Sequence, residues 1–140
     1  MEPFRVAHLF IVGLWGGLVL GETVLELSAR DPAEARFAAR LHYLTDVFVE
    51  IPLLIGVVAS GALLAARAWP FAPLHWVKLG CALLAITANL VCIRRVVVRH
   101  AQAEDAEALA ASGRRVRATW VGVPFGLAAL WIGLACFHRW

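Results

Sequence analysis

The chain has 140 residues, of which 61% are hydrophobic and 16% are charged, and its mean hydropathy is +0.76. A soluble domain of this length carries a much larger charged fraction, so the composition excludes an ordinary soluble globular protein and indicates an integral membrane protein. The formal net charge of +3 is too small and too dispersed to indicate a partner nucleic acid.

Four apolar runs follow one another along the chain, and each is close to the ~20 residues that a helix needs to cross the hydrocarbon core of a bilayer. They cover residues 4–25, 43–66, 75–94 and 118–138. The first run is longer than the apolar part of a signal peptide and lacks a small-residue cleavage site, so we expect a retained span. The sequence therefore predicts an all-α protein, a single domain over residues 1–140 folded as a four-helix transmembrane bundle.

Polar connections separate these runs. The first, ELSARDPAEARFAAR, and the third, RRVVVRHAQAEDAEALAASGRRVR, are rich in arginine, whereas the second, RAWPFAP, is short and holds two prolines. The opposite side of the bundle has few basic residues, among them Arg5, Arg67 and Lys78. The positive-inside rule places the arginine-rich connections in the cytoplasm. We therefore expect both termini on the outer, periplasmic side of a multi-pass protein of the bacterial inner membrane.

In this orientation the ionisable side chains fall into an outer and an inner layer. His8, Trp15 and Glu22 are seven residues apart and share one face of the first span. At 1.5 Å per residue, His8 and Glu22 are about 21 Å apart along the helix axis. They cannot serve one site, so the sequence predicts two candidate sites, or one site and one structural cluster.

The outer layer is a candidate haem site. A b-type haem in a helical bundle needs an inward-facing imidazole, usually opposed by a second axial ligand on a facing helix. His8 and His75 lie at similar depth on spans that can face each other, and Lys78 can pair with a carboxylate of the cofactor. The alternative is structural, because a histidine at the end of a span often caps a helix or reaches toward the interface.

The inner layer combines acidic residues of the first span with a stripe on the second. Glu22 and Glu26 are four residues apart, as are His42, Asp46 and Glu50, so each set lies on one helix face. Carboxylates and an imidazole together can ligate a divalent cation or carry protons. The structural alternative is a collar of ion pairs that includes Glu26 and His42. Its expected basic partners are Arg94, Arg95, Arg117 and the arginines of the first connection.

Along the whole chain, the order of these features resembles the HemJ-type protoporphyrinogen IX oxidases, with the CopD-like and other small four-span families close to them. The resemblance is carried by AHLFIVGLWGG, RLHYLTDVFVEIPLLIGVVASGALL, LHWVKLG, CIRR and VGVP. His8 matches the family's first-span histidine and Lys78 its third-span lysine, while Trp15 and Pro52 match more structural positions. The resemblance implies a membrane protein that binds haem b.

Two features depart from the family's pattern. Asn89 stands where a further histidine of the third span is expected, and the segment that contains Asp46 and Glu50 is more acidic than the family's second span. These departures put the specific oxidase activity in question more than the fold or the haem.

The first functional hypothesis is therefore a haem-b oxidoreductase that oxidises a porphyrinogen-type substrate and passes electrons to quinone. His8 and His75 would be the haem iron ligands, and Trp15 would lie beside the cofactor. Lys78 would bind a carboxylate of the haem or porphyrin, and together with the inner acids Asp46 and Glu50 it forms the predicted catalytic set.

Two further hypotheses come from the inner layer and from the size of the chain. In the second, Glu22, His42, Asp46 and Glu50 form an intramembrane site of a metal-handling or ion-transport protein. In the third, the chain is a non-catalytic subunit of a larger membrane complex, or a homo-oligomer, with membrane lipid around it.

Overall fold

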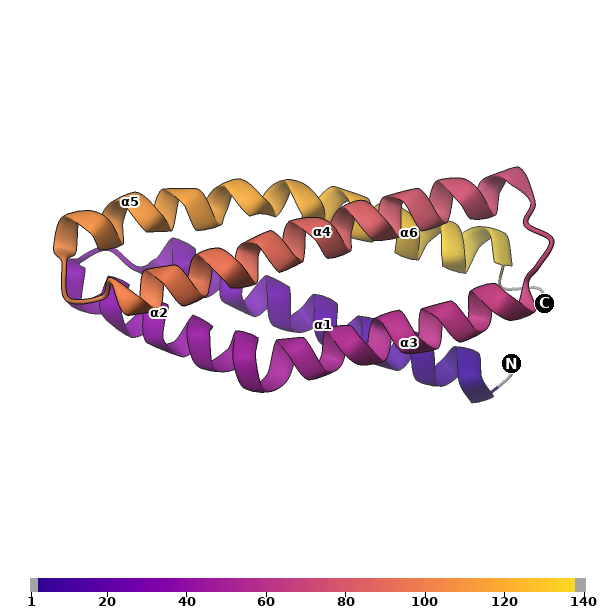
Figure 1. Ribbon diagram of the computed structural model, residues 1–140, viewed down its shortest axis with the longest axis horizontal. Helices are drawn as coiled ribbons and strands as arrows, with labels where there is room; N and C mark the ends of the chain where they lie inside the picture. Colours follow the sequence, from indigo (N-terminus) through magenta and orange to yellow (C-terminus); the bar gives the residue numbers. More distant parts are fainter. Residues whose placement is uncertain (1–2, 138–140) are drawn as a thin grey trace.

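The computed structural model describes residues 3–137, apart from the side chains at positions 106, 136 and 137, and within this range the chain is helical and has no strand. It forms an elongated bundle in which α1 begins and α6 ends at the same end (Figure 1). The elements are α1 (Pro3–Ser28), α2 (Pro32–Thr45), the π-helical turn η1 (Asp46–Glu50), α3 (Ile51–Arg67), α4 (Pro73–Ala101), α5 (Ala106–Arg117), the 3₁₀ turn η2 (Ala118–Val121) and α6 (Gly122–Phe137).

Four helical stretches in the described part of the chain are long and apolar enough to cross a membrane: Pro3–Ser28, Pro32–Arg67, Pro73–Ala101 and Glu107–Ala135. This confirms the predicted all-α class and the number of membrane-length helices. The helices run beyond the predicted spans, because the first and third connections are themselves largely helical and lengthen their neighbours. The predicted end of the fourth span, residue 138, lies outside the described residues.

Aspartates set the starts of the helices that replace these connections. Asp31 precedes α2, and its Oδ1 accepts hydrogen bonds from the backbone N–H groups of Ala33 at 2.8 Å and Glu34 at 2.9 Å. Asp105 caps α5 in the same way. Such caps satisfy N–H groups that have no partner within the helix. Pro32, at the first position of α2, is already restricted to a helical φ angle.

The second long stretch widens in its middle. The backbone N–H of Ile51 donates to the carbonyl of Asp46, five residues earlier, so Asp46–Glu50 forms a π-helical turn. Pro52 follows directly, and within a regular α-helix its ring would crowd the carbonyl four residues earlier. The wider turn accommodates this proline. Turns of this kind are frequent at functional sites, and here both terminal residues are buried acids.

The bundle exposes apolar side chains and buries polar ones. Phe10, Phe48 and Trp131 are 66%, 69% and 72% exposed, whereas Asp46 and Glu50 are 0% and 1% exposed. In water so much exposed apolar surface would favour aggregation. In a bilayer, exposed apolar side chains contact lipid, and polar groups find their partners inside the bundle. The distribution of side chains in this bundle fits that environment.

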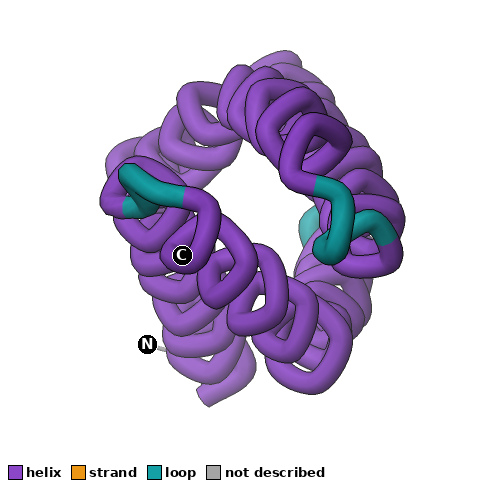
Figure 2. The backbone as a smooth tube through the Cα atoms, turned by 90° about the vertical axis from the view of Figure 1, so that its left-hand side faces the viewer, coloured by secondary structure: helices purple, strands orange, loops and turns teal. Residues whose placement is uncertain are grey.

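The two ends of the bundle pack differently. The inner half consists of α2, η1, α5 and the adjoining parts of α1 and α4. Here α1, α2, α4 and α5 each contact at least two of the others. In the outer half (α3, α6 and the remaining parts of α1 and α4), α1 packs mainly on α3, and α4 packs mainly on α6. Figure 2 shows the helices arranged around the long axis, seen from the inner end.

Candidate metal centre

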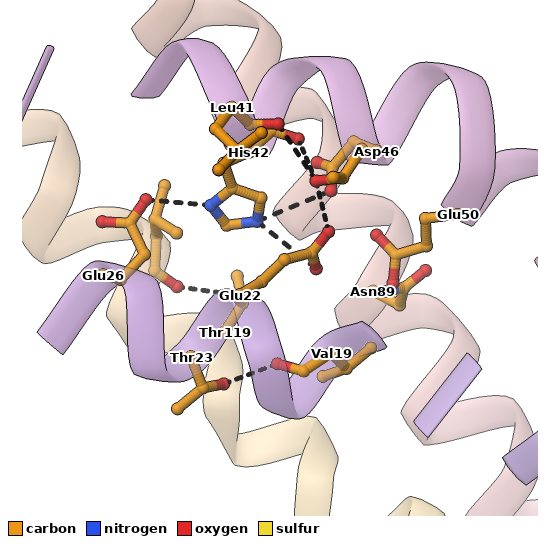
Figure 3. Close-up of polar contacts among 12 residues, drawn as sticks. Val19, Glu22, Thr23, Glu26, Leu41, His42, Asp46, Glu50, Asn89 and Thr119 are labelled. Carbon is orange, nitrogen blue, oxygen red and sulfur yellow. Dashed lines mark hydrogen bonds and ion pairs between the residues drawn. The ribbon is translucent and has the colours of Figure 1, made fainter. Parts of the chain in front are cut away.

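His42 is the centre of a group of ionisable side chains in the inner half, the acid–histidine cluster (Glu22, Glu26, His42 and Asp46; Figure 3). Its Nδ1 lies 2.9 Å from Oε1 of Glu26. Its Nε2 lies 3.7 Å from Oε2 of Glu22 and 3.5 Å from Oδ1 of Asp46. The two acidic positions of α1 therefore meet the polar stripe that begins in α2 and continues into η1.

The cluster is almost completely shielded from solvent. His42 and Glu26 are each 3% exposed, Glu22 is 7% exposed, and Asp46 is 0% exposed. Because α2 already begins at Pro32, the bundle extends beyond His42 toward the inner end and encloses the imidazole ring of His42. Charged groups in such a place are costly unless they are paired or bind an ion.

Arg99 of α4 supports the histidine from behind. Its Nη1 donates to Oε1 of Glu26, the same oxygen that lies beside Nδ1 of His42. A carboxylate accepts and does not donate, so the hydrogen of a neutral His42 ring is on Nδ1 and the lone pair is on Nε2. That lone pair faces Glu22 and Asp46. A carboxylate behind the imidazole is the usual support of a metal-binding histidine.

Asp46 lacks the partners that a buried carboxylate normally has. Both of its side-chain oxygens are buried, and neither accepts a hydrogen bond from the described residues. The nearest basic nitrogen is Nε2 of His42, at 3.5 Å. Leaving a buried polar group unsatisfied costs ~1–3 kcal/mol, and more when the group is charged. This carboxyl group therefore needs a proton or a cation.

Glu50 lies one turn beyond Asp46 and is well satisfied. Its Oε1 accepts hydrogen bonds from Nε1 of Trp15 at 3.0 Å and from Nδ2 of Asn89 at 2.6 Å. Asn89 is therefore turned toward the interior of the bundle. Glu50 links α1, η1 and α4, and it is not among the three residues whose ligand atoms converge on one point.

The converging ligand atoms belong to Glu22, His42 and Asp46, and they lie within 4.8 Å of one another. Ligands at about 2.0–2.2 Å from a tetrahedral zinc ion are about 3.3–3.6 Å apart. The distances from Nε2 of His42 are close to that range. Thr45 donates a hydrogen bond of 2.7 Å to Oε1 of Glu22, which leaves Oε2 on the histidine side. The sequence prediction missed Thr45, although it is adjacent to Asp46.

The predicted outer-layer residues have other neighbours. Nδ1 of His8 lies 2.7 Å from Oγ of Ser60 on α3, so this histidine faces the partner helix of α1. The ring of His75 stacks on that of Phe71, with centroids 5.7 Å apart. Lys78 lies with the end of its side chain against α6.

The predicted arginine partners of the collar are wrong. Arg94 and Arg117 are exposed, and Arg95 donates to the backbone carbonyl of Arg115. The ion pair with Glu26 is made by Arg99 instead. Helical spacing could have identified Arg99 as the arginine that faces the interior. The interior positions of α4 recur every three or four residues, and Arg99 continues the series Ala85, Asn89, Ile93 and Val96.

No protein-family model, curated protein or solved structure matches this chain. The resemblance to the HemJ-type proteins stays a prediction.

Proposed function

We propose that this chain is an intramembrane metal-handling protein that binds a divalent transition-metal ion with Glu22, His42 and Asp46. One observation carries the proposal: three buried metal-ligating groups converge within 4.8 Å, and neither oxygen of Asp46 accepts a hydrogen bond from the part of the chain that the structure describes. A bound cation would balance the negative charge of the acids and give the oxygens of Asp46 the partner that they lack among the described residues. Acidic residues within membrane helices often belong to ion or proton pathways.

The donor set narrows the choice of metal. One imidazole nitrogen with carboxylate oxygens suits zinc, iron(II) or manganese(II), whereas copper(I) prefers thiolate and thioether sulfur. Calcium takes six to eight oxygen ligands, and magnesium keeps several waters, so neither matches a small set that contains an imidazole. Metal binding releases protons from its ligands. Glu50, one turn beyond Asp46, is the next acid along the bundle.

The proposal includes a placement in the bacterial inner membrane. The arginine-rich ends of α2, α4 and α5 would face the cytoplasm, as the positive-inside rule predicts, and both termini would be periplasmic. The acid–histidine cluster would then lie on the cytoplasmic side of the bundle, with Glu50 nearer to the bilayer centre.

Zinc binding by the purified full chain in detergent tests this function. Calorimetric titration should give about one ion per chain, with binding at least about tenfold weaker in Asp46→Asn, because loss of even a supporting group around a metal costs ~10–100-fold in affinity. Glu107→Gln removes an exposed carboxylate of α5 and is the matched control. It should bind zinc as the unaltered chain does. Equal affinities of the two variants, or no binding at all, would contradict the proposal.

Haem b at the outer half is a second candidate, favoured by the hydrogen bonds around His8. The hydroxyl of Ser60 donates to the carbonyl of Gly56 at 2.6 Å, so Nδ1 of His8 is the donor in its contact with Ser60. This leaves the lone pair on Nε2, the atom that would bind haem iron. A Soret band that is lost in His8→Ala and kept in His100→Ala would support this candidate. No Soret band after expression with ample haem would exclude it, together with the proposed porphyrin or quinone chemistry.

A further inference from the structure

A hollow of about 460 Å³ lies at the inner end of the bundle, where α2 begins and α4 ends. It is separate from the acid–histidine cluster and uses none of the residues of that cluster. Its walls come from α2, from the last residues of α4 and from the loop that follows: Arg36, Arg40, His100, Ala101, Ala103 and Glu104.

Positive charge gathers in this hollow without a salt bridge. Arg36 and Arg40 are four residues apart on α2 and therefore lie on one face of that helix. Neither guanidinium group lies within ion-pair distance of a carboxylate among the described residues, although Glu104 lines the same hollow. The two guanidinium groups outnumber the single carboxylate of Glu104, so the hollow is net positive and favours an anionic ligand.

His100 gives the hollow a fixed aromatic wall. Its ring stacks on Tyr43, with centroids 4.1 Å apart and planes 5° from parallel. Its Nδ1 is buried and has no hydrogen-bond partner within the described part of the chain. The carbonyl group of His100 accepts from the backbone N–H of Ala103, so the end of α4 presents fewer free acceptors to an incoming anion.

We propose that this hollow binds a phosphate group, either in the headgroup of an anionic phospholipid or as free phosphate. Guanidinium groups match phosphate oxygens with paired hydrogen bonds, and basic pockets between membrane helices on the cytoplasmic side bind acidic headgroups. The hollow lies at the end of helices long and apolar enough to cross a membrane, so the phospholipid headgroup is the favoured source of the phosphate.

The test uses the full chain in detergent at constant ionic strength. Binding of short-chain phosphatidylglycerol and of inorganic phosphate is measured for the unaltered chain, for Arg36→Gln with Arg40→Gln, and for Arg114→Gln with Arg117→Gln. The last pair removes the same charge from exposed positions outside the hollow. We expect the hollow variant to bind phosphatidylglycerol at least about tenfold more weakly, and the control variant to change less than about twofold.

The comparison of ligands identifies the source of the phosphate. Binding of phosphatidylglycerol alone assigns the hollow to phospholipid, whereas equal binding of inorganic phosphate assigns it to the soluble ion. Equal weakening in both arginine variants, or no binding of either ligand, overturns the proposal. Glu104→Gln keeps the test decisive if the hollow variant does not fold, because it should bind either ligand more tightly. Unchanged binding in Glu104→Gln would also overturn it.

Discussion

The inner and outer halves of the bundle share two long helices, yet different side chains hold each half together. In the inner half, α1, α2, α4 and α5 meet around buried ionisable groups as well as buried apolar side chains, among them Val96, Leu109 and Val116. In the outer half, the helices associate as two pairs, α1 with α3 and α4 with α6. The buried apolar residues there, among those that the structure describes, are Leu54, Val57, Ala85 and Ala129.

This difference separates a specific polar core from ordinary membrane-helix packing. Lipid competes well with apolar contacts between helices, so close packing of small residues holds such pairs together. Buried charges behave differently, because each depends on a particular partner in a particular place. We therefore expect substitutions of polar partners in the inner half to have the largest effects on folding, and apolar contacts in the outer half to matter mainly where backbones are close.

The largest effect is expected for Arg99→Ala. This change leaves Glu26 buried without its guanidinium partner, and breaking one partner of a buried ion pair costs ~3–5 kcal/mol. Arg94→Ala, on the exposed face of the same helix, should stay within ~0.5 kcal/mol of the unaltered chain. The free energy of unfolding in mixed detergent micelles measures both. Similar losses for the two variants would remove the distinction between the specific polar core and its surroundings.

A pair of glycines tests the outer half. A Cβ added at Gly122 would lie 2.5 Å from Cβ of Ala88 on α4, whereas one added at Gly126 would lie 3.7 Å from Cβ of Ala85, an ordinary contact. Gly122→Ala should therefore destabilise the α4–α6 pair by ~1–3 kcal/mol. Gly126→Ala should be neutral or slightly stabilising, because alanine favours helix more than glycine does. The same unfolding measurement compares them, and equal stability of the two variants would refute the close packing.

A smaller effect is expected for Trp15→Phe. Phenylalanine keeps most of the ring but cannot donate to Glu50, which retains the hydrogen bond from Asn89. Loss of a hydrogen bond to a charged group costs ~1.5–3 kcal/mol, and the remaining donor should hold the loss near the lower limit. Trp131→Phe, at a 72% exposed position of α6, is the matched control and should change stability by less than ~0.5 kcal/mol. A control that loses as much as Trp15→Phe would rule out a role for the indole N–H.

The smallest effect on folding is expected for Asp46→Asn in metal-free protein. This carboxylate accepts no hydrogen bond from the described residues, and asparagine has nearly the same shape without the charge. Stability without metal should stay within ~1 kcal/mol or increase, because a buried charge is removed. Added zinc should raise the stability of the unaltered chain more than that of the variant. A loss of several kcal/mol without metal would indicate that Asp46 has a structural role instead.

The fold could be predicted from the sequence because membrane helices are specified by long apolar runs. The lengths of the helices could not, because apolarity ends where the bilayer is expected to end, whereas Pro32–Thr45 and Ala106–Arg117 continue as helices with aspartate caps. The π-helical turn has no residue pattern of its own. Pro52 indicated an irregularity near that place without specifying its form.

The candidate site was predictable in its acids and less so in its supporting residues. Spacing alone placed Glu22 and Asp46 on the faces of their helices that meet in the structure. The choice of Arg99 over its arginine neighbours depended on the phase of α4, which charge alone does not reveal. The convergence of three ligand atoms depends on how two helices cross, and only the tertiary structure contains that information.

Zinc X-ray absorption spectroscopy of the zinc-loaded full chain tests the metal site most directly. The site predicts one imidazole together with oxygen ligands at about 2.0–2.2 Å, and no sulfur at about 2.3 Å. The imidazole signal should disappear in His42→Gln and persist in His100→Gln. A spectrum that is the same in both variants, or one that shows sulfur ligands, would contradict a metal site built from Glu22, His42 and Asp46.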